Sequence, residues 1–394
     1  MRILIVSTTY PPYLSGVAVL TANLATTLSK RHQVTVISTS GTKENKTLRP
    51  NKNLSLRLLP GIRLVKNKNI TLTSPQTKRV EKIIDSFKPD VIHLHDPSPL
   101  ALSALIIAKN KLIPIVATHH FTAELVIKWI IPSNRFSHQI AKNPTTKQTI
   151  YRLVNIFYNR CDLVTIPNPA LIPYFNNAGL KKPIITIPNG IDVKRFSKVK
   201  NKPSQLNHLN LKKSFIILFV GRLDVDKNID TLITAFEGVH QQNSNCHLVL
   251  VGEGNKEKKL RKQTRRAKLT DSIHFLGTIN NTDNSLSAIY KSATIFANPS
   301  IIENQSVSFI EAMSTGLPIV AADTNIQTSY LKHMFNGLLF QPNNPPSLAA
   351  AIQKLISDKK LRRKISKNNL RVSKNYDISI TSRKYLKAYK SLLD

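Results

Sequence analysis

The sequence from Asn298 to Asp323, NPSIIENQSVSFIEAMSTGLPIVAAD, combines two carboxylates with the pattern of a helix, a tight turn and a strand. The carboxylates, Glu303 and Glu311, are eight positions apart. The apolar residues that predict the helix follow Glu303 and are Val307, Phe309, Ile310 and Met313. Residues 314–316 predict a turn, and the apolar run 319–322 predicts a buried strand.

A helix that begins just after Glu303 would place this carboxylate at its N-terminus and Glu311 about two turns further on. The N-terminus of a helix carries partial positive charge and free amide donors, so it suits an anion such as a diphosphate. Carboxylates accept hydrogen bonds from sugar hydroxyls, so the pattern indicates a nucleotide-sugar site. In the alternative interpretation, Glu303 caps a surface helix and Glu311 is a solvated helix residue.

This stretch resembles the Glu-x7-Glu signature of retaining family-4 glycosyltransferases, with the E-A-M-x-x-G-x-P-[IV]-V-A block that follows it in that family. The resemblance implies an α/β protein of the GT-B fold, in which two Rossmann-like domains with parallel sheets face a central cleft. It also implies that Glu303 binds the donor sugar and that Glu311 binds the ribose. The residues between them that would also contact the donor are Asn304, Gln305, Ser306 and Val307. The family commonly has Gly where Ser306 stands, and Gly would let the backbone approach the sugar without a Cβ atom.

A second candidate site lies earlier in the chain, in the loop after the predicted strand 215–220. The loop reads G-R-L-D-x-D-K-N and contains the cations Arg222 and Lys227. Charge-assisted hydrogen bonds contribute about 1.5–3 kcal/mol each, so two cations can hold a diphosphate without a metal. By resemblance to the family, these two residues bind the donor diphosphate and stabilise the leaving nucleotide. The alternative is a solvated charged loop.

Two further segments of the second domain resemble the part of the family that surrounds the nucleotide base. A predicted strand over 247–252 ends in the turn Gly252-Glu253-Gly254, and the family uses this turn beside the base. Residues 272–279 resemble the segment that holds the base through backbone atoms, which makes Ile279 a candidate donor contact.

The N-terminal part of the chain shows a strand over 3–7, a loop and a predicted helix. The residues with helical spacing are Val17, Leu20, Leu24 and Leu28. The loop lacks the G-x-G-x-x-G fingerprint, which argues against a dinucleotide cofactor. Family members often have Gly-Gly where Ser15 and Gly16 stand, and the resemblance implies that the amide of Gly16 meets the donor phosphate.

Histidines follow two predicted strands of the same domain. Alternation along the strand 90–95 places His93 and His95 on one face. A metal site there is conceivable, but no further His or Cys cluster in the sequence supports it. The next strand ends in Thr118-His119-His120, and the T-x-H pattern of the family maps onto Thr118 and His120. The resemblance therefore places His120 near the reaction centre. A different loop register would select His119, and a structural histidine is the other alternative.

The length of 394 residues predicts two domains. The run Ile187-Pro-Asn-Gly-Ile-Asp192 is similar to the end of the first domain in the family, and the polar, basic segment 197–213 reads as the linker. We therefore expect an acceptor-binding domain over 1–196 and a nucleotide-sugar-binding domain over 214–375. The last helix, 376–394, is expected to cross back onto the first domain.

The chain has 57 Lys and Arg against 22 Asp and Glu, a formal net charge of +35, and residues 1–200 hold 29 basic and 8 acidic residues. Such a surface suits an anionic membrane, nucleic acid or an acidic substrate. We favour the membrane and expect no nucleic acid; a compositional bias toward Lys, Asn and Ile is the alternative. The apolar segment 121–132 contains the only Trp and is a candidate for insertion into a headgroup layer, although core packing is the commoner fate of such a helix. No apolar run is long enough for a signal peptide or a spanning helix, and two cysteines build no disulfide framework.

These features predict a retaining, metal-independent glycosyltransferase that uses no cofactor besides its nucleotide-sugar donor. We favour a UDP-hexose over a GDP-hexose as this donor, and glucose as the hexose. The E-x-Q-x-x-x-x-I-E-A-M form of the signature and the run YRLVNIFYNRCD are similar to bacterial diacylglycerol α-glucosyltransferases. The expected acceptor is therefore a membrane lipid such as diacylglycerol, and the expected location is the cytoplasm, peripheral on the inner face of the plasma membrane. The alternatives are a soluble sugar or polysaccharide acceptor, a nucleotide-sugar epimerase, and an inactive nucleotide-sugar-binding or nucleic-acid-binding module.

Overall fold

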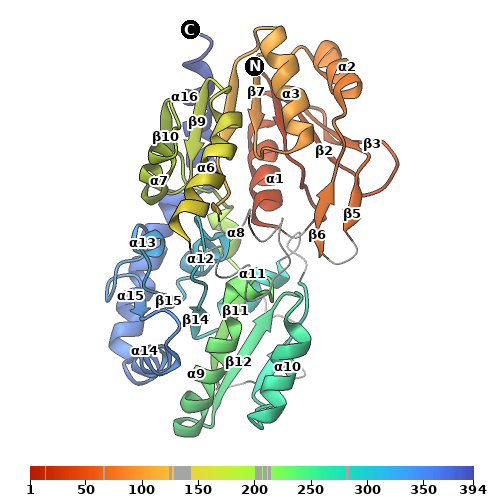
Figure 1. The fold of residues 1–394 in the computed structure, drawn as a ribbon. Coiled ribbons are helices and arrows are strands. Elements are labelled where there is room, and N and C mark those ends of the chain that lie inside the picture. The colour runs from red at the N-terminus through yellow and green to blue at the C-terminus, as the bar shows by residue number, and fades with distance from the viewer. Residues whose placement is uncertain are drawn as a thin grey trace. The chain divides into compact units, whose positions relative to one another are not determined.

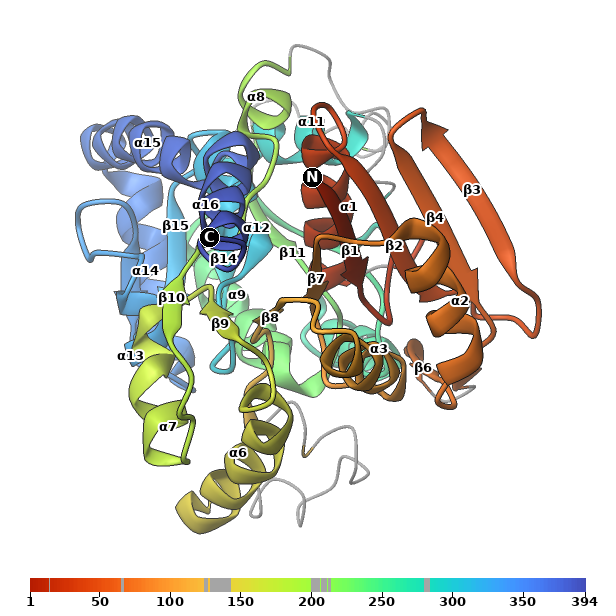
Figure 2. The same cartoon turned by 90° about the horizontal axis from the view of Figure 1, so that it is seen from above.

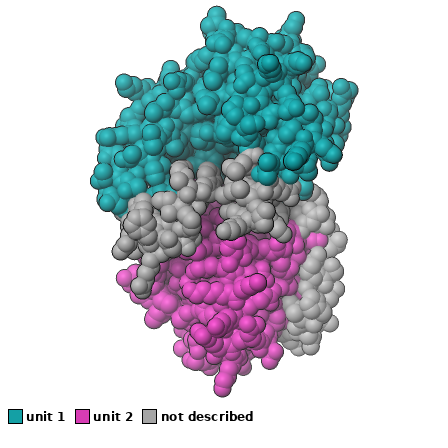
Figure 3. All heavy atoms as spheres, turned by 45° about the vertical axis from the view of Figure 1, so that its right-hand side comes forward, with its two compact units in different colours: residues 1–190, 378–394 teal, residues 191–377 magenta. Residues whose placement is uncertain are grey.

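The computed structural model describes the chain except for residues 14, 65–66, 124–126, 128–142, 200–205, 207–210, 212–213 and 280–283. The chain divides into two compact units, shown in two colours in Figure 3. Unit 1 consists of Met1–Gly190 and Ile378–Asp394, and unit 2 consists of Ile191–Asp377. The boundaries predicted from the sequence are residues 196 and 376. Most of the predicted linker, 197–213, lies outside the described residues.

Unit 1 is built around one sheet that is parallel except at one edge. Its strands, in spatial order, are β10 (Ile184–Thr186), β9 (Leu163–Ile166), β8 (Ile115–Thr118), β7 (Val91–Leu94), β1 (Arg2–Val6), β2 (Gln33–Thr39), β4 (Leu54–Leu59) and β3 (Lys46–Asn51). Only β3 pairs antiparallel, with β4. Chain order reverses between β1 and β7, as in a doubly wound nucleotide-binding fold.

Helices cover both faces of this sheet, as Figures 1 and 2 show. They are α1 (Gly16–Leu28), α2 (Thr77–Phe87), α3 (Pro99–Asn110), α6 (Pro144–Tyr158), α7 (Ile172–Asn177) and α16 (Ile378–Lys390), with the 3-10 turn η1 (Pro169–Leu171). Side chains of α1 and α16 pack with alternate residues of β1 and β2 in one apolar core. The other residues of these strands, except Arg2 and Gln33 at their first positions, are also buried, because α2 and α3 lie on the opposite face (Figure 2). Burial on both faces explains the continuous apolar runs in the sequence.

The segment 41–74 is polar, basic and weakly patterned, which predicts loops around a single strand near 54–59, and the structure differs from this prediction. It contains β3 as well as the hairpin of β5 (Ile62–Leu64) and β6 (Asn67–Leu72). Every residue of β3 is exposed, so its sequence KTLRPN carries no alternation of apolar and polar residues. A strand without a buried face cannot be found from hydrophobic periodicity.

Unit 2 has an entirely parallel sheet in the order 3-2-1-4-5-6 of the Rossmann fold. The strands are β13 (Ile273–Phe275), β12 (Cys246–Val251), β11 (Phe215–Val220), β14 (Ile295–Asn298), β15 (Ile319–Ala322) and β16 (Leu338–Phe340). One face packs on α9 (Ile229–Gln242), α10 (Glu257–Arg266), α14 (Pro345–Ser357) and α15 (Lys359–Ser373). The other face packs on α8 (Val193–Ser197), α11 (Ser285–Ser292) and α12 (Val307–Ser314).

The remaining elements of unit 2 are short: α13 (Asn325–Thr328) and the 3-10 turns η3 (Val225–Lys227) and η4 (Lys374–Tyr376). The sequence predicts a longer helix over 326–334 in place of α13, and this prediction is wrong. The chain turns away after Thr328 because the carbonyl of Tyr330 and the amide of Lys332 are both hydrogen-bonded by the buried side chain of Asn336.

Candidate active site

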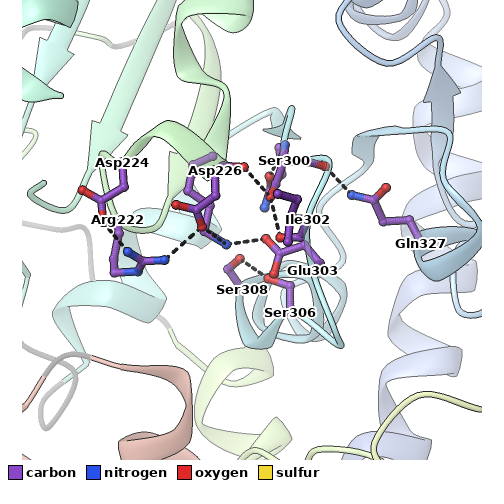
Figure 4. A network of polar contacts seen from close by, with 11 residues as sticks. Arg222, Asp224, Asp226, Ser300, Ile302, Glu303, Ser306, Ser308 and Gln327 are labelled. Carbon is purple, nitrogen blue, oxygen red and sulfur yellow. Dashed lines mark hydrogen bonds and ion pairs between the residues drawn. The ribbon is translucent and has the colours of Figure 1, made fainter. Parts of the chain in front are cut away.

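The loop between β14 and α12 contains Glu303, and it is longer than the sequence predicts. Helix α12 begins at Val307, the first of the apolar residues that predict it, with Ser306 as its N-cap residue, so the condition that would place Glu303 at the helix N-terminus is not met. The loop folds around Ser300, whose hydroxyl donates to the carbonyl of Ile302 at 3.1 Å and whose carbonyl accepts from Gln327 Nε2 at 2.7 Å. These contacts hold Glu303 in the loop rather than at the helix N-terminus (Figure 4).

Glu303 forms an ion pair with Lys227 from the loop after β11. Lys227 Nζ lies 2.6 Å from Glu303 Oε1, and the two side chains are 14% and 9% exposed. Two predicted site residues that are 76 positions apart in the sequence are therefore in direct contact. Because both are largely removed from water, their interaction is screened less than a surface ion pair.

Arg222 extends the same cluster, as Figure 4 shows. Its guanidinium contacts the carboxylates of Asp224 and Asp226, with Nη2 2.9 Å from Asp226 Oδ2. Lys227 Nζ is 3.8 Å from the same Asp226 oxygen. Burial lowers the pKa of Arg222, but the charges of Asp226, Asp224 and Glu303 outweigh it, and the net pKa lies above the ordinary value. The guanidinium is therefore held as a cation.

The position of this cluster follows from the sheet order of unit 2. Arg222 and Lys227 follow β11, Glu303 follows β14, and β11 and β14 are neighbours at the point where chain order reverses. Ligands of doubly wound sheets bind beyond the carboxyl ends of the strands at this switch point. The fold thus concentrates two cations and the three carboxylates that pair with them where a nucleotide ligand is expected.

Glu311 lies in the second turn of α12 and is 4% exposed. The hydroxyl of Tyr290, on α11, donates to Glu311 Oε2 at 2.8 Å. The interpretation of Glu311 as a solvated helix residue is therefore wrong, because a carboxylate buried to this degree needs partners. Tyr290 was not singled out from the sequence, since an aromatic residue in an apolar helix gives no sign of such a role.

Four of the seven residues between the two glutamates, 304–307, are the predicted donor contacts, and they form the end of the loop and the first residue of α12. Gln305 is buried, whereas Asn304, Ser306 and Val307 are half-buried. The hydroxyl of Ser306 pairs with that of Ser308 at 2.9 Å. Ser306, which stands where the family commonly has Gly, therefore directs its side chain along the first turn of the helix.

Gly252 occupies a backbone position that excludes other residues. Its φ is +126°, and a Cβ atom there would lie 2.0 Å from the carbonyl oxygen of Gly221. The turn after β12 consequently packs directly on the loop that contains Arg222. Ile279, the candidate base contact, packs against the apolar core beneath α11 and α12.

In unit 1, Ser15 and Gly16 start helix α1. Ser15 is the N-cap residue, and its hydroxyl accepts from the amide of Ala18 at 3.1 Å and pairs with Thr9 Oγ1 at 3.2 Å. Gly16 is the first residue of the helix. Ser15, which stands where family members often have Gly, therefore supplies a helix cap.

The predicted histidines gather at the carboxyl ends of β7 and β8. His95 Nδ1 lies 3.1 Å from His120 Nε2, and the rings of His93 and His95 are 4.2 Å apart. Burial lowers the pKa of His120 to about 4, and burial together with the charge of His120 lowers that of His93 to about 3. His119 instead lies between Tyr158 and Phe175, with ring centroids 4.4 and 3.9 Å away. Near neutral pH these histidines are uncharged.

The C-terminal helix α16 reaches this histidine cluster. Tyr389 Oη lies 2.8 Å from His93 Nδ1, and His93 Nε2 lies 2.6 Å from Thr118 Oγ1. Tyr385 Oη is 3.1 Å from the same Thr118 oxygen. Tyr385 and Tyr389 are four positions apart on one helix face, and that spacing was the only signal in the sequence for this contact.

Other predictions concern metals and membranes. Among the described residues, no group of three or more His, Cys, Asp or Glu side chains is arranged to hold a metal ion. In that same part of the chain, no helix has the length and apolarity required to cross a bilayer. Most of the apolar segment 121–132, including Trp129, lies outside the described residues.

Comparison with known proteins agrees with the geometry. Residues 14–195 match the family described as Glycosyltransferase Family 4, and residues 201–372 match Glycosyl transferases group 1. The chain is 25% identical over 359 residues to the alpha-monoglucosyldiacylglycerol synthase of Streptococcus pneumoniae, covering 89% of this chain and 77% of that protein. It is 26% identical to the synthase of the same name from Acholeplasma laidlawii, covering 87% and 85%.

Among solved structures, the Anabaena protein HepE in complex with UDP-glucose superposes with a TM-score of 0.76 at 20% identity, covering 99% of this chain and 100% of that one. This likeness concerns the fold, and it confirms the predicted GT-B class with two Rossmann-like units. The two family matches establish that the chain belongs to the family-4 glycosyltransferases, enzymes that use nucleotide sugars.

Proposed function

We propose that this glycosyltransferase moves a hexose, glucose, from a UDP-sugar to a membrane lipid such as diacylglycerol, with retention of configuration and without a metal. The observation that carries the proposal is the cluster of Arg222, Lys227 and Glu303 at the switch point of unit 2. The names of the two relatives support glucose and a diacylglycerol lipid as the reactants.

Metal independence rests on the two cations. Transfer of the sugar from a nucleotide-diphosphate sugar develops negative charge on the departing diphosphate, and fixed positive charge stabilises it. Arg222 and Lys227 supply that charge through N–H donors held in place by buried carboxylates. In the proposed reaction, the bond between the anomeric carbon and the diphosphate oxygen breaks as the acceptor hydroxyl attacks from the same face. The diphosphate takes the hydroxyl proton.

Glu303 and Glu311 have different proposed roles. Glu303, in the loop beside Lys227, binds hydroxyls of the donor sugar, and Glu311, held by Tyr290, binds the ribose. His120 and Gly16 are further proposed donor contacts by resemblance to the family. No residue is assigned as a nucleophile, because the proposed reaction has no covalent enzyme intermediate.

Exposed side chains on helix α6 support the proposal that the acceptor is a membrane lipid. Leu153 and Ile156 are 62% and 54% exposed, and they are neighbours on one helix face. Arg152, on the same helix, and Arg160, two residues after the helix ends, are also exposed. Apolar side chains flanked by cations suit the headgroup layer of an anionic bilayer, where each Lys or Arg contributes roughly 1 kcal/mol. A peripheral position on the cytoplasmic face of the plasma membrane is therefore part of the proposal.

A product screen tests this function. The purified protein is incubated with UDP-glucose, UDP-galactose or GDP-mannose and with vesicles containing diacylglycerol or with soluble sugars, in the presence and absence of EDTA. We expect α-glucosyldiacylglycerol from UDP-glucose, unaffected by EDTA, with the anomeric configuration read by NMR. Glu303→Ala should give no product. A β-linked product, loss of turnover in EDTA or glucosylation of soluble sugars alone would overturn the corresponding part of the proposal.

Co-sedimentation with vesicles tests the membrane surface separately. The protein should bind vesicles that contain an anionic lipid and bind neutral vesicles much less. Replacement of both Leu153 and Ile156 by Ser should weaken binding, whereas Ser at Tyr174, an exposed residue 48% accessible on α7, is the control. Equal binding to neutral and anionic vesicles would exclude an electrostatic contribution.

A further inference from the structure

The proposed phosphate-binding cation Arg222 is shared between two carboxylates two positions apart, Asp224 and Asp226. One terminal nitrogen, Nη1, contacts Asp224 Oδ2, and the other, Nη2, lies 2.9 Å from Asp226 Oδ2. A guanidinium presents its donors in a fixed planar fork. Asp224 therefore occupies N–H groups of Arg222 that a bound phosphate would also need.

Asp226 is buried in the loop and held there by several contacts. Its side chain is 3% exposed, and its Oδ2 lies between Arg222 and Lys227, 3.8 Å from Lys227 Nζ. Its backbone carbonyl accepts a hydrogen bond of 3.1 Å from the hydroxyl of Ser300. A carboxylate this buried, between two cations, fixes their positions, and its removal would leave both less constrained.

Asp224 is held differently. Its side chain is 13% exposed, and besides Arg222 it accepts a hydrogen bond of 2.9 Å from the backbone amide of Asn255, after β12. The amide of Asn255 can keep Asp224 in place while Arg222, whose side chain is 32% exposed, turns toward another anion. The contact between Asp224 and Arg222 is thus the one in this cluster that can be exchanged without exposing a buried carboxylate.

The charges around the site make such an exchange costly. The cluster contains two cations, Arg222 and Lys227, and three carboxylates, those of Asp224, Asp226 and Glu303. A diphosphate that binds here adds negative charge to a cluster whose carboxylates already outnumber its cations. A phosphate and a carboxylate use the same fork of a guanidinium.

We propose that Asp224 competes with the diphosphate of the nucleotide for Arg222 and thereby weakens nucleotide binding, whereas Asp226 positions Arg222 and Lys227 for it. This inference rests on the proposed role of Arg222 and Lys227 as diphosphate ligands. Weaker binding of the nucleoside diphosphate favours its release after transfer, so Asp224 sets the balance between donor capture and product release.

Titration calorimetry with UDP and, separately, inorganic pyrophosphate tests the competition. Asp224→Asn keeps the shape of the side chain and removes its charge, and it should bind both anions about 3- to 30-fold more tightly than the wild type. Asp224→Glu should bind no more tightly than the wild type. Glu257→Gln is the matched control, because it also removes one charge and one ion pair from unit 2, with Arg261 at 2.8 Å, but does not contact Arg222.

Asp226→Asn should shift the affinity in the opposite direction, to weaker UDP binding. If this variant does not fold, the comparison of Asp224→Asn with Glu257→Gln decides. Affinity of Asp224→Asn equal to or weaker than that of the wild type, or an equal gain in Glu257→Gln, would overturn the inference. Arg222→Ala separates this result from the proposed function: unchanged UDP binding in Arg222→Ala, or no binding of either anion by the wild type, refutes the phosphate site itself and the inference with it.

Discussion

Lys227 Nζ lies 2.6 Å from Glu303 Oε1, so a residue assigned to the diphosphate is paired with a residue assigned to the donor sugar. The two come from adjacent strands, β11 and β14, at the switch point of the sheet in unit 2. A donor that places its β-phosphate on Lys227 and its sugar on Glu303 would span the length of this ion pair. Under the proposed assignment, the pair lies at the boundary between the phosphate and the sugar of the donor.

Removal of Lys227 should therefore lower turnover more than removal of another ion-paired lysine of unit 2. Lys227→Ala should lower turnover of the nucleotide sugar by about 10²-fold, because a charged donor aimed at the leaving group is lost. The matched control is Lys256→Ala, which breaks an ion pair with Asp230 at 3.2 Å in the same unit and should keep near wild-type turnover. Steady-state rates of nucleotide release measure both. Equal rates for the wild type and Lys227→Ala would refute the assignment.

Tyr290→Phe tests the orientation of Glu311. The change removes the hydroxyl that donates to Glu311 Oε2 at 2.8 Å and leaves the buried ring in place. A hydrogen bond to a charged group contributes about 1.5–3 kcal/mol, so the donor KM should rise about tenfold or more, with a smaller change in kcat. Donor-concentration series give both constants. A fall in kcat at constant KM would place Glu311 at the reacting bond rather than at the ribose.

Replacement by Ala is expected to change the free energy of unfolding in opposite directions at Gly252 and at Gly238. Gly252→Ala should lower the free energy of unfolding by about 3 kcal/mol or more, since φ is +126° and the new Cβ would meet the Gly221 carbonyl oxygen at 2.0 Å. Gly238 lies inside α9 with no atom within 4 Å of an added Cβ. Gly238→Ala should raise the free energy of unfolding by about 0.5–1 kcal/mol. Urea unfolding of both variants measures the difference, and destabilisation of equal size in both would contradict the packing described.

The buried histidines predict acid sensitivity of unit 1. Burial lowers the pKa of His120 to about 4, and burial with the charge of His120 lowers the pKa of His93 and His119 to about 3, against an ordinary value of 6.5. Below pH 6.5 the unfolded chain binds protons that the folded chain does not, so the free energy of unfolding falls as pH drops from about 6.5 toward 4. Each histidine contributes a slope of about 1.4 kcal/mol per pH unit.

Urea unfolding at a series of pH values measures this slope. His119→Phe keeps a ring between Tyr158 and Phe175 and removes one titrating group, so it should reduce the slope by about one histidine's share. A free energy of unfolding that is constant between pH 6.5 and 4.5 would show that these side chains are solvated.

Much of the fold could be predicted from the sequence because both sheets are buried on two faces. The run 215–220 matches β11 residue for residue, and the helices expected over 346–357 and 359–370 correspond to α14 and α15. β3 was missed because none of its residues is buried. The length of the loop before α12 could not be predicted, because a hydrogen bond between Ser300 and Gln327, 27 positions apart, helps to hold it.

The candidate site, like the fold, could be predicted from the sequence only in part. Charge and spacing within a single segment could single out the cations Arg222 and Lys227, and the same holds for the two glutamates in their segment. Their partners could not: Asp226 reads as one more charge in a polar loop, and Tyr290 and Tyr389 read as core aromatics. Side-chain partners that lie on other elements depend on the packing of those elements, which local sequence patterns do not contain.

The most direct test of the account is a crystal structure of the protein with UDP. We expect oxygens of the β-phosphate within hydrogen-bond distance of both Arg222 and Lys227, and the ribose hydroxyls within hydrogen-bond distance of Glu311. UDP bound elsewhere on the protein, or bound at the carboxyl ends of β11 and β14 with its phosphates directed away from both cations, would contradict it.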